Sequence, residues 1–214
     1  MQKHLAELLQ RIPCLFPLKE ALEKALALLL ACARSGGKIL ICGNGGSAAD
    51  AEHIAGELMK GFLLPRPLPQ SAQEALRAVC PEYGPLLAAR LQSGIAAVSM
   101  VSGVALPTAF ANDVGPELCF AQQVTALGRP GDIVWGISTS GNSTNVNHAL
   151  RTAKALGLST LGLTGRDGGA MAALCEVELR IPADKTPLIQ ELHLPVYHAL
   201  CAALEEELFS VYQG

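Results

Sequence analysis

This chain of 214 residues has few aromatic residues, no excess of positive charge and no long apolar run. Aromatic residues make up only 4% of it although 50% of the residues are hydrophobic, so the core must be built mainly from aliphatic side chains. Alanine and leucine dominate, which favours helices. The formal net charge of −3 argues against binding to the phosphate backbone of nucleic acids, which requires a basic face. No uninterrupted apolar run reaches about 18 residues, which argues against a membrane span.

The sequence also lacks the marks of an exported, disulfide-bonded protein. It has seven cysteines, an odd number, and no two of them form a C-x-x-C pair. The first residues, MQKHLAELLQRIP, follow an amphipathic helical pattern with charges throughout, unlike a signal peptide. We therefore expect reduced, mostly buried thiols in a cytoplasmic protein. A nucleophilic role for Cys42 is disfavoured because no base neighbours it in the sequence.

Helical stretches alternate with short apolar runs along the chain. Strands are expected at 38–43, 95–100, 132–138, 159–165 and 175–181. Helices are expected at 3–12 and 17–34, within an N-terminal segment 1–36, and at 84–92, at 116–128 and from the 138–143 turn to about 156. Two further helices are expected with named N-caps: one that begins after Ser47, and one over 186–209 with Thr186 as its N-cap. The alternation predicts one α/β domain over residues 1–214, with a doubly wound, mostly parallel five-stranded sheet flanked by helices.

Two of the predicted strands end in loops of small polar residues. GNGGS spans residues 43–47, and STSGNS spans residues 138–143. Small residues let backbone N–H groups approach an anion at a helix N-terminus, and the second loop adds several hydroxyl groups. One such loop is as well explained by an ordinary capping turn. Two of them at the carboxyl ends of separate strands favour a phosphate site.

Two familiar nucleotide-binding patterns fail at the first of these loops. Gly43, Gly45 and Ala48 fit the G-x-G-x-x-A dinucleotide pattern, but that fold needs a second strand ending in an acid about 20 residues later. The sequence there is GFLLPRPLPQ, whose three prolines indicate a loop. No lysine follows the glycines, so the P-loop pattern fails as well.

The motifs together resemble the sugar isomerase (SIS) family. GNGGSAADAEH, the Asn112-Asp113 pair, STSGNS, TGRDGG (164–169) and QELH (190–193) occur in the family's order over nearly the whole chain. The likeness is to the branch that interconverts sedoheptulose 7-phosphate and D-glycero-D-manno-heptose 7-phosphate through an enediol. It implies a flavodoxin-like domain with a long C-terminal helix, and a cytoplasmic homotetramer with active sites between subunits.

The resemblance also implies roles for individual residues. The phosphate would rest on Ser138, Thr139, Ser140 and Ser143, and the sugar would contact Asn44, Gly45, Gly46, Ser47, Asp113 and Gln190. Glu57 matches the catalytic base of the family and His198 its catalytic acid. In zinc-binding members the ligands match His53, Glu57, Gln190 and His198, so zinc is a candidate cofactor.

Three departures from the family pattern leave the isomerase class in place and the sugar open. Lys60-Gly61-Phe62 stands where the family commonly has Gly-Arg-Phe or Gly-Arg-Tyr. A proline-containing insertion occupies residues 62–92, and it could be a lid or a subunit contact. Pro187 replaces an acidic residue three positions before Gln190.

The chemistry of these residue types agrees with an isomerase, and two alternatives stay open. A partly desolvated carboxylate such as Glu57 can remove a proton from carbon, and a histidine can donate one to oxygen. His53 and Glu57 could instead be an exposed i, i+4 pair. Gln190 and His198 lie about 12 Å apart along a straight helix, so we expect two subunits to share each zinc site. The alternatives are a non-catalytic SIS protein that binds a protein partner and a sugar-phosphate sensor; His193 is left without a role.

Overall fold

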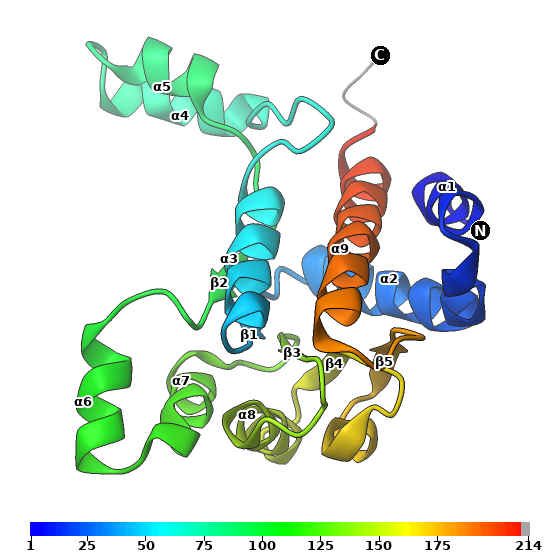
Figure 1. Ribbon diagram of the computed structural model, residues 1–214. Coiled ribbons are helices and arrows are strands. Elements are labelled where there is room, and N and C mark those ends of the chain that lie inside the picture. Colours follow the sequence, from blue (N-terminus) through cyan, green and yellow to red (C-terminus); the bar gives the residue numbers. More distant parts are fainter. Residues whose placement is uncertain (211–214) are drawn as a thin grey trace.

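The computed structural model describes residues 1–210 and has one parallel sheet at its centre (Figure 1). The sheet has the order β2-β1-β3-β4-β5, and every neighbouring pair of strands is parallel. The strands are β1 (Ile39–Cys42), β2 (Ala97–Ser99), β3 (Ile133–Ser138), β4 (Ser159–Thr164) and β5 (Val177–Arg180). This is the flavodoxin-like strand order, so the predicted doubly wound α/β fold is confirmed.

Helices cover both faces of the sheet. One face packs against α2 (Lys19–Arg34), α3 (Gly46–Met59) and α9 (Thr186–Phe209), with α1 (Lys3–Arg11) and the short 3-10 helix η1 (Pro13–Leu18) beside them. The other face packs against α7 (Cys119–Leu127) and α8 (Thr144–Ala155), with η3 (Gly169–Ala173) after β4. None of the helices within residues 1–210 is long and apolar enough to cross a bilayer.

The strands are buried on both sides because their side chains alternate between the two helical layers. Ile39 and Ile41 belong to the core under α2, α3 and α9, whereas Leu40 and Cys42 belong to the core under α7 and α8. All four are inaccessible to solvent. A strand enclosed in this way reads as a continuous apolar run, which is why the sequence identified it.

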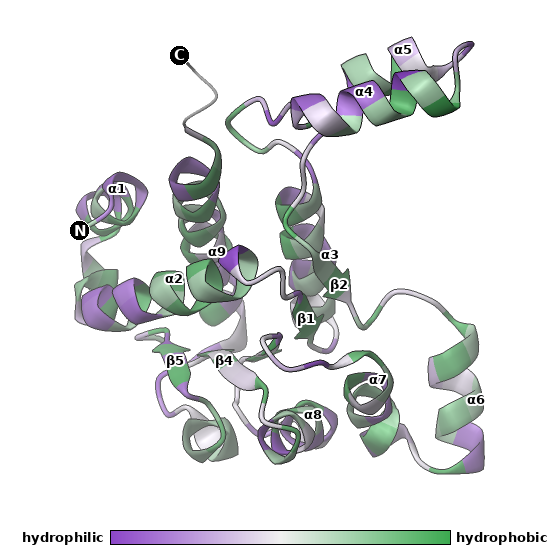
Figure 2. Ribbon diagram, turned by 180° about the vertical axis from the view of Figure 1, so that it is seen from behind, coloured by the Kyte–Doolittle hydropathy of each residue, from purple (hydrophilic) through white to green (hydrophobic). Residues whose placement is uncertain are grey.

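The main differences from the sequence prediction lie between α3 and α7. Residues 62–92 contain two helices, α4 (Gln70–Val79) and α5 (Gly84–Arg90), of which only the second was expected. They pack on each other and project from the body as an arm with hydrophobic and hydrophilic residues (Figures 1 and 2). A further helix, α6 (Ala105–Asp113), precedes η2 (Pro116–Leu118) and α7, where a single helix over 116–128 was predicted.

Both predicted N-caps are wrong by one or two residues. Gly45, at φ 56°, is the N-cap of α3, and Ser47 lies buried in the first turn. Glycine adopts this left-handed φ without the strain that a Cβ would cause, so the chain turns into the helix before the serine is reached. The N-cap of α9 is Lys185, and Thr186 is already helical.

Candidate active site

The loops that follow β1 and β3 meet at the carboxyl edge of the sheet. The strand order reverses between these two strands, and such a switch point is where open α/β sheets bind ligands. Asn44 of the first loop and Asn145 in the first turn of α8 exchange two side-chain hydrogen bonds of 2.8 and 2.9 Å. Gln190 of α9 also reaches this edge, because its side chain fills the space in which a Cβ on Gly46 would lie.

The loop of residues 138–143, called here the serine loop, is tightly folded. The hydroxyl groups of Ser138 and Ser143 are 2.9 Å apart, and Ser140 Oγ accepts a bond from the Asn142 N–H. Gly141 has φ 65°, and a Cβ there would lie 1.9 Å from the Gly168 carbonyl oxygen. The loop is therefore held against the 165–169 turn by a contact that only glycine permits.

A pocket of about 240 Å³ opens beside the serine loop. Thr139 and Ser140 line it from the loop, and Arg166 lines it from the turn after β4 together with the carboxylates of Asp167 and Asp184. Arg166 Nε is 2.7 Å from Asp184 Oδ1, and both side chains are more than half exposed. Arg166 belongs to the TGRDGG motif but was not identified from the sequence, although an arginine next to a hydroxyl-rich loop is itself a signal for phosphate.

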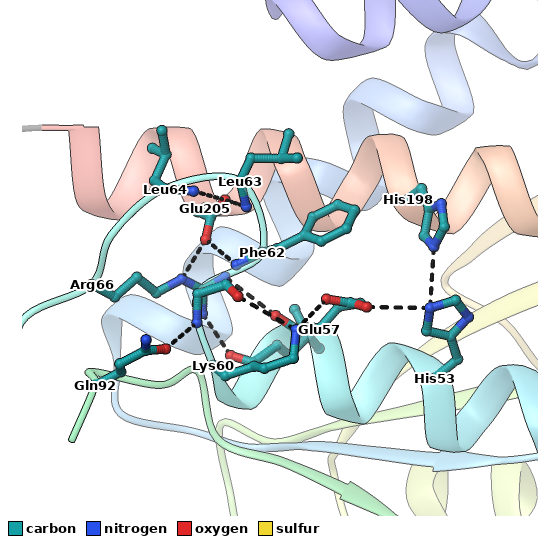
Figure 3. Close-up of polar contacts among 12 residues, drawn as sticks. His53, Glu57, Lys60, Phe62, Leu63, Leu64, Arg66, Gln92, His198 and Glu205 are labelled. Carbon is teal, nitrogen blue, oxygen red and sulfur yellow. Dashed lines mark hydrogen bonds and ion pairs between the residues drawn. The ribbon is translucent and has the colours of Figure 1, made fainter. Parts of the chain in front are cut away.

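His53, Glu57 and His198 come together where α3 and α9 run side by side (Figure 3). Glu57 Oε1 is 3.2 Å from His53 Nε2, and Glu57 Oε2 is 2.8 Å from Lys60 Nζ. His198 Nε2 is 3.4 Å from His53 Nε2, so α9 brings a second imidazole to the pair. The Glu57 side chain is only 13% exposed, which makes it more than a solvated helix residue.

The surroundings lower the pKa of both the proposed base and the proposed acid, which leaves the base charged and the acid uncharged. Burial raises the pKa of Glu57, but Lys60 and His53 outweigh burial and leave the pKa below its ordinary value, so the carboxylate is ionised. Burial and the nearby His53 lower the pKa of His198 despite the Glu57 carboxylate, so this imidazole is neutral near pH 7.

A row of polar side chains behind His53 was not found from the sequence. Tyr197 OH is 2.9 Å from His53 Nδ1 and donates to Asp50 Oδ1 at 3.3 Å. Burial, then Asp50, raise the pKa of Tyr197, so the phenol keeps its proton. His193 is fully buried with Nδ1 3.9 Å from Asp50 Oδ2, and neither atom has a hydrogen-bond partner within the described chain. These residues support His53 from the side opposite to Glu57.

One copy of the chain does not bring all the predicted site residues together. Glu57 lies eleven residues after Gly46, about 16 Å along α3 from the end that meets the serine loop. Gln190 lies at the loop end and His198 at the Glu57 end. Helix α6 lies at the periphery of the molecule (Figure 1), and Asp113 at its end is exposed and accepts a side-chain hydrogen bond from Asn112.

The predicted zinc ligands fit the metal in donor chemistry but not as one set within a single copy. The His53 distances of 3.2 and 3.4 Å resemble the spacing between two ligands of a tetrahedral zinc with bonds of about 2.0–2.1 Å. Across residues 1–210, however, no group of three or more His, Cys, Asp or Glu side chains is arranged to hold a metal ion. The zinc site stays a prediction.

Comparison with known proteins gives a consistent result over the whole chain. Two sequence profiles, each described as SIS domain, match residues 3–84 and 86–204. A phosphoheptose isomerase of Trichlorobacter lovleyi is 39% identical over 100% of this chain and 98% of its own, and one of Desulfovibrio desulfuricans is 44% identical over 85% and 74%.

Two solved structures with this architecture are also phosphoheptose isomerases. The phosphoheptose isomerase of Neisseria gonorrhoeae aligns with a TM-score of 0.73 at 36% identity over 95% of both chains. That of Francisella tularensis aligns with a TM-score of 0.75 at 31% identity over 92% of this chain and 91% of its own. From its motifs, strand order and full-length relatives, the chain belongs to the SIS domain family, in the group that includes the phosphoheptose isomerases.

Proposed function

We propose that this protein is an aldose–ketose isomerase that interconverts sedoheptulose 7-phosphate and D-glycero-D-manno-heptose 7-phosphate through an enediol. The observation that carries the proposal is the ionised, largely buried Glu57 beside the imidazole rings of His53 and His198, within an SIS fold. The relatives named phosphoheptose isomerase give the substrate class.

The reaction needs a base at carbon and an acid at oxygen, and the two helices supply both. Glu57 removes the proton from the carbon next to the carbonyl, and the same carboxyl group returns it to the neighbouring carbon. His198 donates its N–H proton to the carbonyl oxygen as the enediol forms, and it takes back the proton of the neighbouring hydroxyl as the new carbonyl forms. A neutral imidazole suits this step, because it can donate an N–H without repelling other cations.

The serine loop and the glycine loop (residues 43–47) are the proposed binding end for the sugar phosphate. The hydroxyls of Ser138, Thr139, Ser140 and Ser143 and the N-terminus of α8 offer convergent donors to an anion. Arg166 lines a pocket with Thr139 and Ser140 of the serine loop and can exchange its contact with Asp184 for one with the phosphate.

We propose that each active site combines the binding end of one copy with the catalytic pair of another, within a homotetramer. An extended seven-carbon chain with its phosphate is shorter than the roughly 16 Å that separate the serine-loop end of α3 from Glu57 in one copy. Mixing Gln190→Ala and His198→Ala subunits tests this: hybrids regain activity if the residues act in different copies, and lack of any recovery contradicts it.

The proposal includes zinc as the cofactor and the cytoplasm as the location of the protein. His53, Glu57, His198 and a Gln190 side chain would hold zinc, which would polarise the substrate carbonyl as a Lewis acid. A cytoplasmic location agrees with the seven cysteines, all of which are free. Metal content of the purified protein, measured by mass spectrometry, tests the zinc assignment.

A Glu57→Gln variant tests the function directly. A thermal-shift screen of five- to seven-carbon sugar phosphates first identifies the ligand, and product analysis then follows its conversion. The variant should keep ligand binding and lose turnover by a factor of at least about 100, as expected for a general base. A native protein that binds a sugar phosphate without converting it would instead be a sensor, and one that binds none would fit a protein-binding relative.

A further inference from the structure

A buried ionic cluster lies next to the proposed catalytic pair. Glu205 of α9 and Arg66 of the loop after α3 are both fully buried, with Arg66 Nε 2.6 Å from Glu205 Oε1 (Figure 3). Buried charges of this kind are rare unless they are fully paired. The catalytic mechanism proposed above uses neither residue.

The Glu205 carboxylate holds the loop through its backbone. It accepts hydrogen bonds from the N–H groups of Phe62, Leu63 and Leu64, at 2.8, 2.7 and 3.0 Å. Three successive backbone donors converging on one carboxylate fix the path of the chain directly after α3. We call Glu205, Arg66 and these three N–H groups the Arg66–Glu205 cluster.

The Arg66 guanidinium ties the same loop to the end of α3. It donates to the carbonyl oxygens of Leu58 at 2.7 Å and Glu57 at 3.3 Å, which are among the last carbonyls of the helix and lack partners within it. Arg66 also lies over the ring of Phe209 at 4.8 Å. One arginine therefore contacts the backbone of the proposed base and the carboxylate on α9.

The loop fixed in this way carries two groups to the catalytic pair. Lys60 contacts the Glu57 carboxylate, and the Phe62 ring lies 5.3 Å from the His198 ring. His198 and Glu205 are seven residues apart on α9 and so share one face of the helix. Movement of the loop would change the surroundings of both Glu57 and His198.

The geometry points to the Arg66–Glu205 cluster as a positioning device that fixes the distance and orientation between Glu57 on α3 and His198 on α9. This inference rests on the proposed isomerase function for its catalytic consequence, but not for its structural one. The hydrogen bonds of the cluster go to the backbone of the loop and of the end of α3, so it acts by holding the ends of two helices and the loop between them.

The test separates positioning from stability with a double variant. Replacing both charges in Arg66→Met/Glu205→Met avoids leaving one buried charge unpaired, and such exchanges often keep a protein folded. It still removes the acceptor for three backbone N–H groups. The control is Arg34→Met/Glu207→Met, which removes an exposed ion pair of 4.0 Å between α2 and α9.

Two readouts are expected to change only in the cluster variant. Amide hydrogen exchange of residues 60–66 should become faster, and kcat should fall by about 100-fold with KM changed less than about twofold, as for a misplacement of catalytic groups by an ångström or so. The control should match the native protein in both. If the double variant does not fold, Phe62→Ala replaces it: the NMR signals of the His198 ring should shift, with the same loss of kcat.

The outcomes judge the two proposals separately. Unchanged exchange in residues 60–66, or faster exchange with unchanged kcat, overturns the positioning role. In the Phe62→Ala variant, unchanged His198 signals or unchanged kcat overturn it. A native protein without turnover on any sugar phosphate refutes the isomerase function, whereas the exchange and NMR data still report whether the cluster holds the loop and His198.

Discussion

The serine loop offers a sharp test of how the backbone shapes the proposed phosphate site, through the substitution Gly141→Ala. Gly141 has φ 65°, and an added Cβ would meet the carbonyl oxygen of Gly168 at 1.9 Å and its carbonyl carbon at 2.4 Å. Both atoms are backbone, so relief requires the loop or the facing turn to move. The Gly141 carbonyl also accepts the Met171 N–H at 3.0 Å, so movement would disturb that bond as well.

The expected cost has two parts that a second glycine separates. A left-handed conformation costs a residue with a Cβ about 1–2 kcal/mol. Overpacking against fixed atoms adds about 1–3 kcal/mol. Gly157, between α8 and β4, has φ 72°, and an added Cβ there would meet nothing within 4 Å, so Gly157→Ala measures the first part alone. We expect about 2–5 kcal/mol for Gly141→Ala and about 1–2 kcal/mol for the control.

Urea unfolding of both variants at equal protein concentration gives the free energies of unfolding. Because the displaced loop carries the proposed phosphate contacts, Gly141→Ala should also raise KM for the sugar phosphate, whereas Gly157→Ala should not. Equal losses of stability in the two variants would refute the close-contact argument. A normal KM in Gly141→Ala would show that the loop conformation does not matter for the phosphate.

Two further predictions concern pH. Burial raises the pKa of Glu57 and the Lys60 ammonium lowers it, so Lys60→Met should raise this pKa and move the acid limb of the kcat/KM profile to higher pH. Lys24→Met, which removes an exposed lysine from another ion pair, is the control and should not move the limb. An unmoved limb in Lys60→Met contradicts the assignment of Glu57 as the base. Burial also raises the pKa of Asp132, but hydrogen bonds led by that of Lys38 outweigh it and lower the pKa. Asp132→Asn should therefore lower the free energy of unfolding at neutral pH, and the difference should shrink as the pH falls below 3.8, through the lowered folded value; a difference independent of pH contradicts this.

The parts of the fold that the sequence predicted are those whose signal is local. β1 and β3 are continuous apolar runs followed by small polar residues, and their loops meet where parallel strands end. The i, i+4 spacing of His53 and Glu57 also placed them on one helix face, and the structure shows them 3.2 Å apart. In each case residues close together in the sequence determine the local structure, so it could be predicted from this one sequence.

The missed helices show where local reading fails. Pro65, Pro67 and Pro69 mark a loop, but the last of them is the N-cap of α4, and the helix-forming stretch QSAQEALRAV follows at once. Its apolar residues at 72, 75, 76 and 79 follow the i, i+3, i+4, i+7 spacing of an amphipathic helix, although none of the α4 residues is buried. A proline directly before good helix formers is a start signal that could have been used.

The contacts that organise the catalytic end could not be read from the sequence, because they join residues far apart in the chain. Arg66 and Glu205 are 139 positions apart, and each looks like an ordinary surface charge in its local sequence. Tyr197 and Asp50 are 147 apart and support His53 only because α3 and α9 lie side by side. Local patterns locate the reactive side chains, whereas their orientation depends on the packing of two helices.

Helix α9 therefore provides most of the side chains that contact the proposed site residues on α3. Along α9, Gln190 meets the glycine loop, Tyr197 and His198 meet His53, and Glu205 holds the loop after Glu57. These contacts line up along the full length of α3, from its first turn to its last. A shift of α9 by one turn would move every one of them by about 5.4 Å, far beyond hydrogen-bond range. The buried charge at Glu205 opposes such a shift, because its carboxylate would lose its four donors and a buried charge without partners is costly.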